Sequence, residues 1–112
     1  MADQLALPLF LAPIVALPRR RQTIDERFRA FHAANPHVFD LLVILARRMR
    51  ARGGRVGIKA CWERLRWEYR ERVEGDQWAR LNNSLTSRYA RLITERCPDL
   101  VDVIETRELR AA

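Results

Sequence analysis

Four segments of this chain carry apolar residues at the spacing of an α-helix, and each segment is followed by residues that stop a helix. Apolar side chains that recur every three or four positions form one face of a helix, and that face needs a partner to bury it. The stops are Asn35-Pro36, Gly53-Gly54, Gly75-Asp76 and Cys97-Pro98. Four such faces in 112 residues predict a single all-α domain with a four-helix core.

The first predicted helix begins at Thr23, because Thr23 and Glu26 have the spacing of a capping box. At Asn35-Pro36 this helix ends and the second begins, with asparagine suited to the N-cap and proline to the first helical position. The third begins at Ile58 and the fourth at Asn82-Asn83-Ser84. The side chains that we expect to be buried are Phe28, Phe31, Leu42, Leu45, Trp62, Leu65, Tyr89 and Leu92.

The stretch between the third and fourth helices, residues 70–81, lacks a helical period and turns at Gly75-Asp76. It predicts a short β ribbon or an ordered loop with Trp78 as its anchor. We expect the folded domain to cover residues 22–112 and to be mainly helical throughout.

Residues 1–21 differ in pattern from the rest of the chain. An apolar run from Leu5 to Leu17 is interrupted by prolines and followed by three arginines. The run is shorter than the roughly 20 residues of a membrane-spanning helix, and a secretory signal would carry its positive charge in front. We therefore expect no membrane partner and an extended, proline-containing arm that is dispensable for folding. An irregular strap across the core and an arm for interaction or dimerisation are the alternatives.

The net charge of +7 is concentrated between Arg47 and Arg72. That stretch holds nine arginines and Lys59 against three glutamates, whereas the charges in the rest of the chain balance. A basic block of this kind indicates a polyanion or an acidic protein as the partner.

No pattern in the sequence points to catalysis or to a bound metal. His32 and His37 lie on either side of a helix break, so we interpret them as surface or capping residues. Cys61 and Cys97 have no metal-site spacing, which favours a reduced, cytoplasmic protein with Cys61 in its core. We expect a protein that is not an enzyme and that holds no cofactor or metal.

The predicted fourth helix carries the strongest functional pattern. With its apolar residues turned inward, the opposite side presents Ser84, Ser87, Arg88 and Arg91. Short polar residues at a helix start, followed by arginines, are typical of a recognition helix in the DNA major groove. The basic block adds as candidate phosphate contacts Arg47, Arg55, Lys59 and Arg66.

Trp67 lies on the charged side of the third helix, opposite Ile58. We expect the segment that follows the helix to cover this ring. An exposed tryptophan there would instead mark a protein interface, for which Trp78 is the second candidate.

Four short motifs in the second half of the chain are Gly57-Ile58-Lys59-Ala60, Trp62-Glu63-Arg64-Leu65-Arg66-Trp67, Leu81-Asn82-Asn83 and Thr86-Ser87-Arg88-Tyr89-Ala90-Arg91-Leu92-Ile93. With these motifs the chain resembles a set of small uncharacterised bacterial and phage-borne proteins, over roughly Thr23 to Leu109. The resemblance implies no activity and no site residue. The layout from Ile58 to Arg91 is also similar to helix-turn-helix and winged-helix proteins, although residues 70–81 replace the three- or four-residue turn of that motif.

Taken together, these features predict a small regulator that binds duplex DNA through a helix-turn-helix-like core. The alternative is a protein-interaction module, such as a phage-type inhibitor or adaptor, that binds an acidic protein through Trp67, the arm or the basic face. RNA binding, a structural role and a homodimer stay open.

Overall fold

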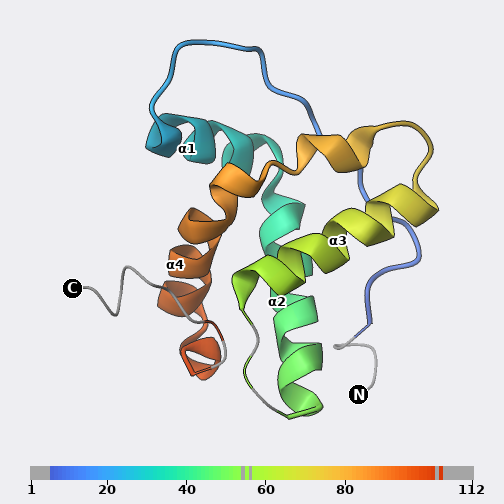
Figure 1. Ribbon diagram of the computed structural model, residues 1–112, viewed down its shortest axis with the longest axis vertical. Coiled ribbons are helices and arrows are strands. Elements are labelled where there is room, and N and C mark those ends of the chain that lie inside the picture. The colour runs from blue at the N-terminus through green and yellow to red at the C-terminus, as the bar shows by residue number, and fades with distance from the viewer. Residues whose placement is uncertain (1–5, 54, 56, 103, 105–112) are drawn as a thin grey trace.

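The structure is a computed structural model in which residues 6–53, 55, 57–102 and 104 are described. Within these residues the protein is all-α, as the sequence predicts, and no strand forms (Figure 1). The α-helices are α1 (Ile24–Ala34), α2 (Pro36–Ala51), α3 (Ile58–Arg72) and α4 (Thr86–Arg96). The described residues also form the short 3-10 helices η2 (Gln77–Arg80), η3 (Asn83–Leu85) and η4 (Pro98–Leu100).

The capping box at the start of α1 and the glycine stop after α2 form as the sequence predicts. The Thr23 hydroxyl accepts the amide of Glu26 at 3.1 Å, and the Glu26 carboxylate accepts the amide of Thr23 at 3.0 Å. The backbone hydrogen bond from Thr23 is the main reason that the pKa of Glu26 lies below its usual value. At the other end of the helical pair, α2 stops at Ala51 and Gly53 follows with a φ of 91°, a conformation that glycine adopts at little cost.

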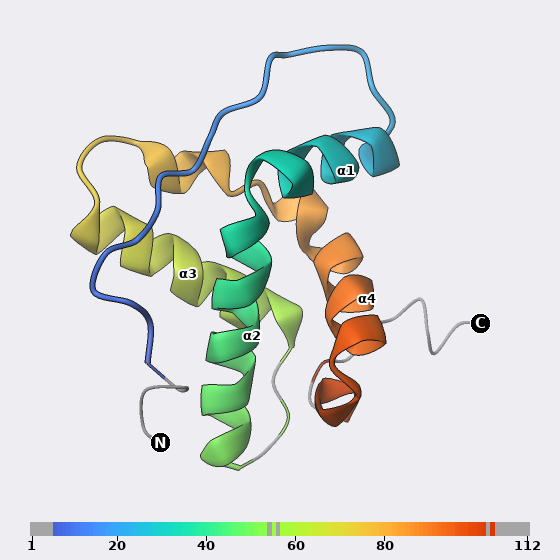
Figure 2. The same cartoon turned by 180° about the vertical axis from the view of Figure 1, so that it is seen from behind.

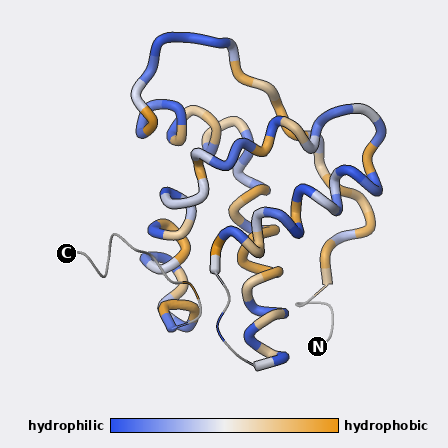
Figure 3. The backbone as a smooth tube through the Cα atoms, viewed as in Figure 1, coloured by the Kyte–Doolittle hydropathy of each residue, from blue (hydrophilic) through white to orange (hydrophobic). Residues whose placement is uncertain are grey.

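Helix α2 lies at the centre of the molecule, and α1, α3 and α4 pack against it (Figures 1 and 2). Its backbone is coloured largely as hydrophobic in Figure 3, in keeping with burial on several sides. Of the side chains predicted as core, Phe28 and Leu92 are half-buried and the others are buried. The predicted core is therefore confirmed except at these two positions.

Phe28 and Leu92 depart from the prediction for different reasons. Phe28 lies at the rim of the core, where its ring packs edge-on against Tyr89 at 4.8 Å between centroids. Leu92 lies at the edge of the buried face of α4. That face consists of Thr86, Tyr89, Ala90 and Ile93.

The link between α3 and α4, residues 73–85, contains no β ribbon. It bends at Gly75, which has a φ of 88°, and then forms η2 and η3. Asn82 caps η3 by accepting the amide of Ser84 at 2.9 Å, so α4 itself begins only at Thr86. Trp78 is half-buried against the core, as its predicted role as an anchor requires. The link lacks the tight turn that a helix-turn-helix places between its two helices.

Two residues of the N-terminal arm belong to the hydrophobic core, as the alternative of an irregular strap across the core expects. The arm is extended, as predicted, but Leu11 is only 5% exposed and Ile14 is fully buried. The arm crosses α3 and passes η2 before it turns toward the start of α1 (Figure 2). Its hydrophobic part faces these elements, and the chain becomes hydrophilic where it leaves them (Figure 3). We call residues 6–17 the strap.

Side chains from α3 and η2 hold the backbone of the strap by hydrogen bonds. These bonds join Tyr69 to the Ala12 carbonyl at 2.6 Å, Arg72 to the Pro8 carbonyl at 2.6 Å, Arg80 to the Ile14 carbonyl at 2.6 Å and Gln77 to the Ile14 amide at 2.9 Å. Burial raises the pKa of Tyr69 to about 12, so its hydroxyl stays protonated and donates. The strap is therefore fastened at several points along its length.

Asn35 fastens the strap to the junction between α1 and α2. Its fully buried side chain accepts the Val15 amide at 2.6 Å and donates to the Val15 carbonyl at 3.1 Å. The same amide group donates to the carbonyl of Phe31 at 3.2 Å. Asn35 occupies the predicted N-cap position of α2, but its side chain makes no capping bond. The strap uses that side chain instead.

After α4 the chain turns back onto the core through η4. Leu100 and Ile104 are both buried there. The remainder of the predicted domain, up to Leu109 and the end at residue 112, lies outside the described residues.

Candidate nucleic-acid interface

Arg88, which the sequence predicts to read DNA from the fourth helix, forms contacts inside the protein. Its Nε lies 3.0 Å from Oδ1 of Asp25 at the start of α1, and its Nη1 lies 3.3 Å from Oγ of Ser87. Ser87 and Arg88 are both half-buried. Among the four residues predicted for this arc, only Ser84 and Arg91 are exposed.

Two arginines of the basic block are engaged in the same way. Arg66 donates to Oε1 of Glu63 at 3.0 Å, and its guanidinium lies 5.5 Å from the ring centre of Trp78. Arg47 donates to both carboxylate oxygens of Asp99, at 3.1 and 3.2 Å. The hydrogen bond from Arg47 is the main cause that lowers the pKa of Asp99. A DNA phosphate would have to compete with these acidic partners.

The other two candidates of the block, Arg55 and Lys59, are exposed in the loop after α2 and at the start of α3. The eight residues predicted from the sequence are thus distributed over α2, this loop, α3, η3 and α4. Arg66 reaches from α3 to η3, where its Nη1 lies 3.4 Å from Oδ1 of Asn83, the neighbour of Ser84.

A different set of basic residues surrounds a pocket of about 540 Å³. The pocket lies where the end of the strap and the segment after it pass α1, η2 and η3. Its lining consists of Val15, Ala16, Leu17, Pro18, Arg19, Arg20, Gln22, Arg27, Phe31, Ala79, Arg80, Asn82 and Leu85. No acidic residue belongs to this lining. We call it the arginine pocket.

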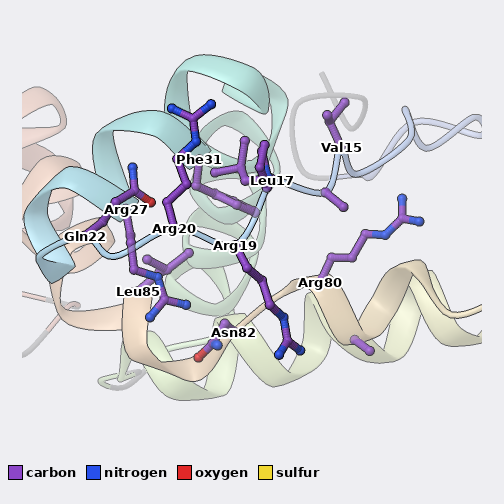
Figure 4. Close-up of a pocket in the computed structure, with 13 residues that line it drawn as sticks. Val15, Leu17, Arg19, Arg20, Gln22, Arg27, Phe31, Arg80, Asn82 and Leu85 are labelled. Carbon is purple, nitrogen blue, oxygen red and sulfur yellow. The ribbon is translucent and has the colours of Figure 1, made fainter.

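The arginines of the pocket come from three parts of the chain (Figure 4). Arg19 and Arg20 follow the strap, Arg27 lies on α1, and Arg80 ends η2. In Figure 4, Arg19 and Arg27 extend toward the same side as Asn82, whereas Arg20 extends in the opposite direction over α1. Two cationic groups and one amide thus share one side of the pocket.

The lining of the arginine pocket contains no acidic residue that could face its arginines. In the described part of the chain, Arg19, Arg20 and Arg27 form no ion pair. Arg80 is held differently, because its Nη1 donates to the Ile14 carbonyl at 2.6 Å and so fixes the wall that the strap forms. Uncompensated guanidinium groups at one place favour a bound anion, above all a carboxylate or phosphate that accepts two parallel hydrogen bonds.

Sequence reasoning missed this pocket because no local pattern marks it. The run Arg19-Arg20-Arg21 is plain in the sequence, but there it only ends an arm that the sequence predicts to be separate from the domain. Arg27 and Arg80 are 53 positions apart in the sequence. Both lie outside the segment from Arg47 to Arg72 that holds the net charge. The position of the strap, which is a tertiary feature, brings these residues together.

Both histidines are more buried than the sequence predicts. His32 is half-buried, with its ring stacked on Phe28 and its Nδ1 3.4 Å from the Tyr89 hydroxyl. His37 is half-buried as well. Burial is the main cause that lowers the pKa of each histidine. Their half-buried positions correct the interpretation of both as surface or capping residues.

Within the described residues, the cysteines are buried and the potential metal ligands are dispersed. Cys61 and Cys97 are free thiols in buried positions, and burial raises the pKa of Cys61 to about 11. A thiol with so high a pKa is a weak nucleophile. In the same part of the chain, no three histidine, cysteine or carboxylate side chains are grouped to hold a metal ion.

The two tryptophans proposed as a protein interface differ in exposure. Trp67 is 53% exposed on α3, so the prediction that the following segment covers it is wrong. The η2 segment of the link does pack against α3, with Trp78 beside Arg66 and Arg70, but Trp67 stays outside this contact. Trp78 itself is half-buried under the guanidinium groups of Arg66 and Arg70.

The chain matches no protein-family model, and neither a curated protein nor a solved structure matches it significantly. Over the described residues, every helix is too short or too polar to cross a membrane.

Proposed function

We propose that this protein is a non-enzymatic nucleic-acid-binding protein that holds duplex DNA by its phosphate backbone at the arginine pocket. The observation that carries the proposal is that Arg19 and Arg27 extend to the same side of one pocket whose lining contains no acidic residue (Figure 4). Guanidinium groups bind phosphate through paired hydrogen bonds, and contacts of this kind position a protein on DNA without reading sequence.

The contrast with the basic block supports this choice of surface. Among the described residues, five arginines between residues 47 and 72 are already held in surface ion pairs within the protein, with Glu63, Glu68 and Asp99 as their partners. Arginines of that block in salt bridges are Arg47, Arg50, Arg64, Arg66 and Arg72. Because a bound phosphate gains more from an uncompensated cation than from one already paired, the pocket is the better anchor for DNA.

The proposal predicts salt-dependent binding to duplex DNA of random sequence. Near physiological salt we expect a Kd of roughly 10⁻⁴ to 10⁻⁶ M, the usual range of non-specific binding. Fluorescence anisotropy of a labelled duplex, at about 50 and 200 mM salt, measures both the affinity and its loss with salt. Binding weaker than about 10⁻⁴ M at the higher salt concentration would remove the DNA proposal.

A protein partner is the second candidate function, and the exposure of Trp67 favours it. Large aromatic side chains dominate many protein interfaces, and Trp67 is a large aromatic side chain that is 53% exposed. This surface lies on α3, apart from the pocket lining. If the folded protein does not bind duplex DNA, a protein partner at Trp67 becomes the leading candidate function.

A further inference from the structure

The arginine pocket is a hollow rather than a flat basic surface, and its volume bears on what it binds. At about 540 Å³ it falls within the range of roughly 300–1,000 Å³ that is typical of small-molecule sites. The backbone of a regular duplex lies on a protein surface and does not need a hollow of this size. A group that has left the duplex would fill it.

The lining divides into a cationic part and an apolar part. Arg19 and Arg27 supply charge toward one side (Figure 4), while the apolar lining residues with exposed surface include Val15, Leu17 and Pro18. An inorganic anion would satisfy the arginines and leave the apolar residues in contact with water. A ligand that joins a phosphate to a flat, weakly polar ring would match both parts at once.

Two amide side chains of the lining, Gln22 and Asn82, add groups that can recognise the edge of a base. The Oδ1 of Asn82 already accepts the amide of Ser84 at 2.9 Å, so its NH₂ group is the part left to donate. A nucleobase offers ring nitrogens and carbonyl oxygens as acceptors for such a donor.

The walls of the pocket are held in place by the rest of the fold. Arg80 is bonded to the Ile14 carbonyl at 2.6 Å, and Asn35 is bonded to both backbone groups of Val15. A site on fixed walls loses little conformational entropy when its ligand binds.

We infer that the arginine pocket takes one unpaired nucleotide, with its phosphate at Arg19 and Arg27 and its base against the apolar residues. The inference rests on the proposed function and narrows it to a nucleotide at a strand end or in an unpaired stretch. The same chemistry belongs to a free mononucleotide, so the test must separate these two sources.

The test compares two labelled duplexes of the same sequence, one blunt and one with a short unpaired 5′-phosphorylated extension. We expect the extended duplex to bind roughly tenfold more tightly, the order of effect that one bound base produces. Equal affinities for the two duplexes would overturn the inference and leave the proposed function standing, whereas no binding to either would overturn both.

Unlabelled dAMP and inorganic phosphate, added as competitors, identify the source of the nucleotide. Stronger competition by dAMP than by phosphate supports a nucleotide pocket, and competition at micromolar dAMP assigns the pocket to free nucleotides. If only millimolar dAMP reduces the preference for the extended duplex, the pocket is assigned to a nucleotide within a strand. Equal competition by dAMP and phosphate would show that the apolar residues contribute nothing, and would overturn the inference.

Matched variants locate the effect. Leu17→Asn changes a half-buried apolar residue of the lining and should abolish the preference for the extended duplex, while Leu9→Asn changes a fully exposed strap residue outside the lining and should retain it. If Leu17→Asn does not fold by thermal melting, Gln22→Ala serves in its place and should reduce the preference about threefold. A preference unchanged in a folded lining variant would contradict the inference.

Discussion

Asn35 shows how one residue can satisfy a local pattern and yet serve a distant segment. The pair Asn35-Pro36 correctly predicts where α1 ends and α2 begins, because proline cannot continue the first helix and suits the first turn of the second. The use of the Asn35 side chain was not predictable, because its partner Val15 is 20 positions away on an arm without periodicity. The buried Asn35 carboxamide hydrogen-bonds to both the backbone amide and the backbone carbonyl of Val15, as a neighbouring β-strand would.

We predict that Asn35→Ala lowers the free energy of unfolding by roughly 1–3 kcal/mol, because it leaves the backbone groups of Val15 without partners. Urea denaturation measures the change. Asn83→Ala is the control, since Asn83 is exposed and accepts only a 3.4 Å hydrogen bond from Arg66, and it should cost less than about 0.5 kcal/mol. Equal effects of the two substitutions would show that Asn35 does not hold the strap.

The elements of the fold differ in how far the sequence determines them. The limits of α1 and α2 follow from caps and stops within a few residues, and the sequence predicts them well. The strap has no such pattern, since Leu11 and Ile14 are separated by Pro13 and bury against partners from α3, η2 and the α1–α2 junction. The candidate site depends on the position of the strap, so it could not be predicted from the sequence for the same reason.

The strap gives a prediction at the scale of an element. Ile14→Ala should lower the free energy of unfolding by roughly 2–5 kcal/mol, because Ile14 is fully buried. Leu9→Ala, in the same strap but fully exposed, should change it by less than about 0.5 kcal/mol. Chemical denaturation of the two variants decides the point: a loss below about 0.5 kcal/mol for Ile14→Ala would restore the interpretation of a dispensable arm.

At the scale of the whole molecule, the distribution of charge along the sequence differs from its distribution in space. The segment from Arg47 to Arg72 holds the net charge of +7, but several of its arginines bind acids such as Glu63, Glu68 and Asp99. Residues 19–29 hold five arginines against two acidic residues, and Arg19 and Arg27 have no acidic partner among the described residues. Counting charges along a sequence cannot reveal this, because ion pairs form between positions that folding brings together.

The measurement that tests the central proposal most directly compares two double variants that carry the same net charge. Arg19→Gln with Arg27→Gln removes two arginines of the pocket, and Arg21→Gln with Arg29→Gln removes two exposed arginines from the same segments that do not line it. The salt dependence of duplex binding, followed by anisotropy, counts the phosphate contacts that each pair loses. We predict that the slope of log Kobs against log[salt] becomes shallower by about two for the pocket pair and changes little for the other. An equal change in both pairs would mean that DNA responds only to net charge, and would contradict an anchor at the arginine pocket.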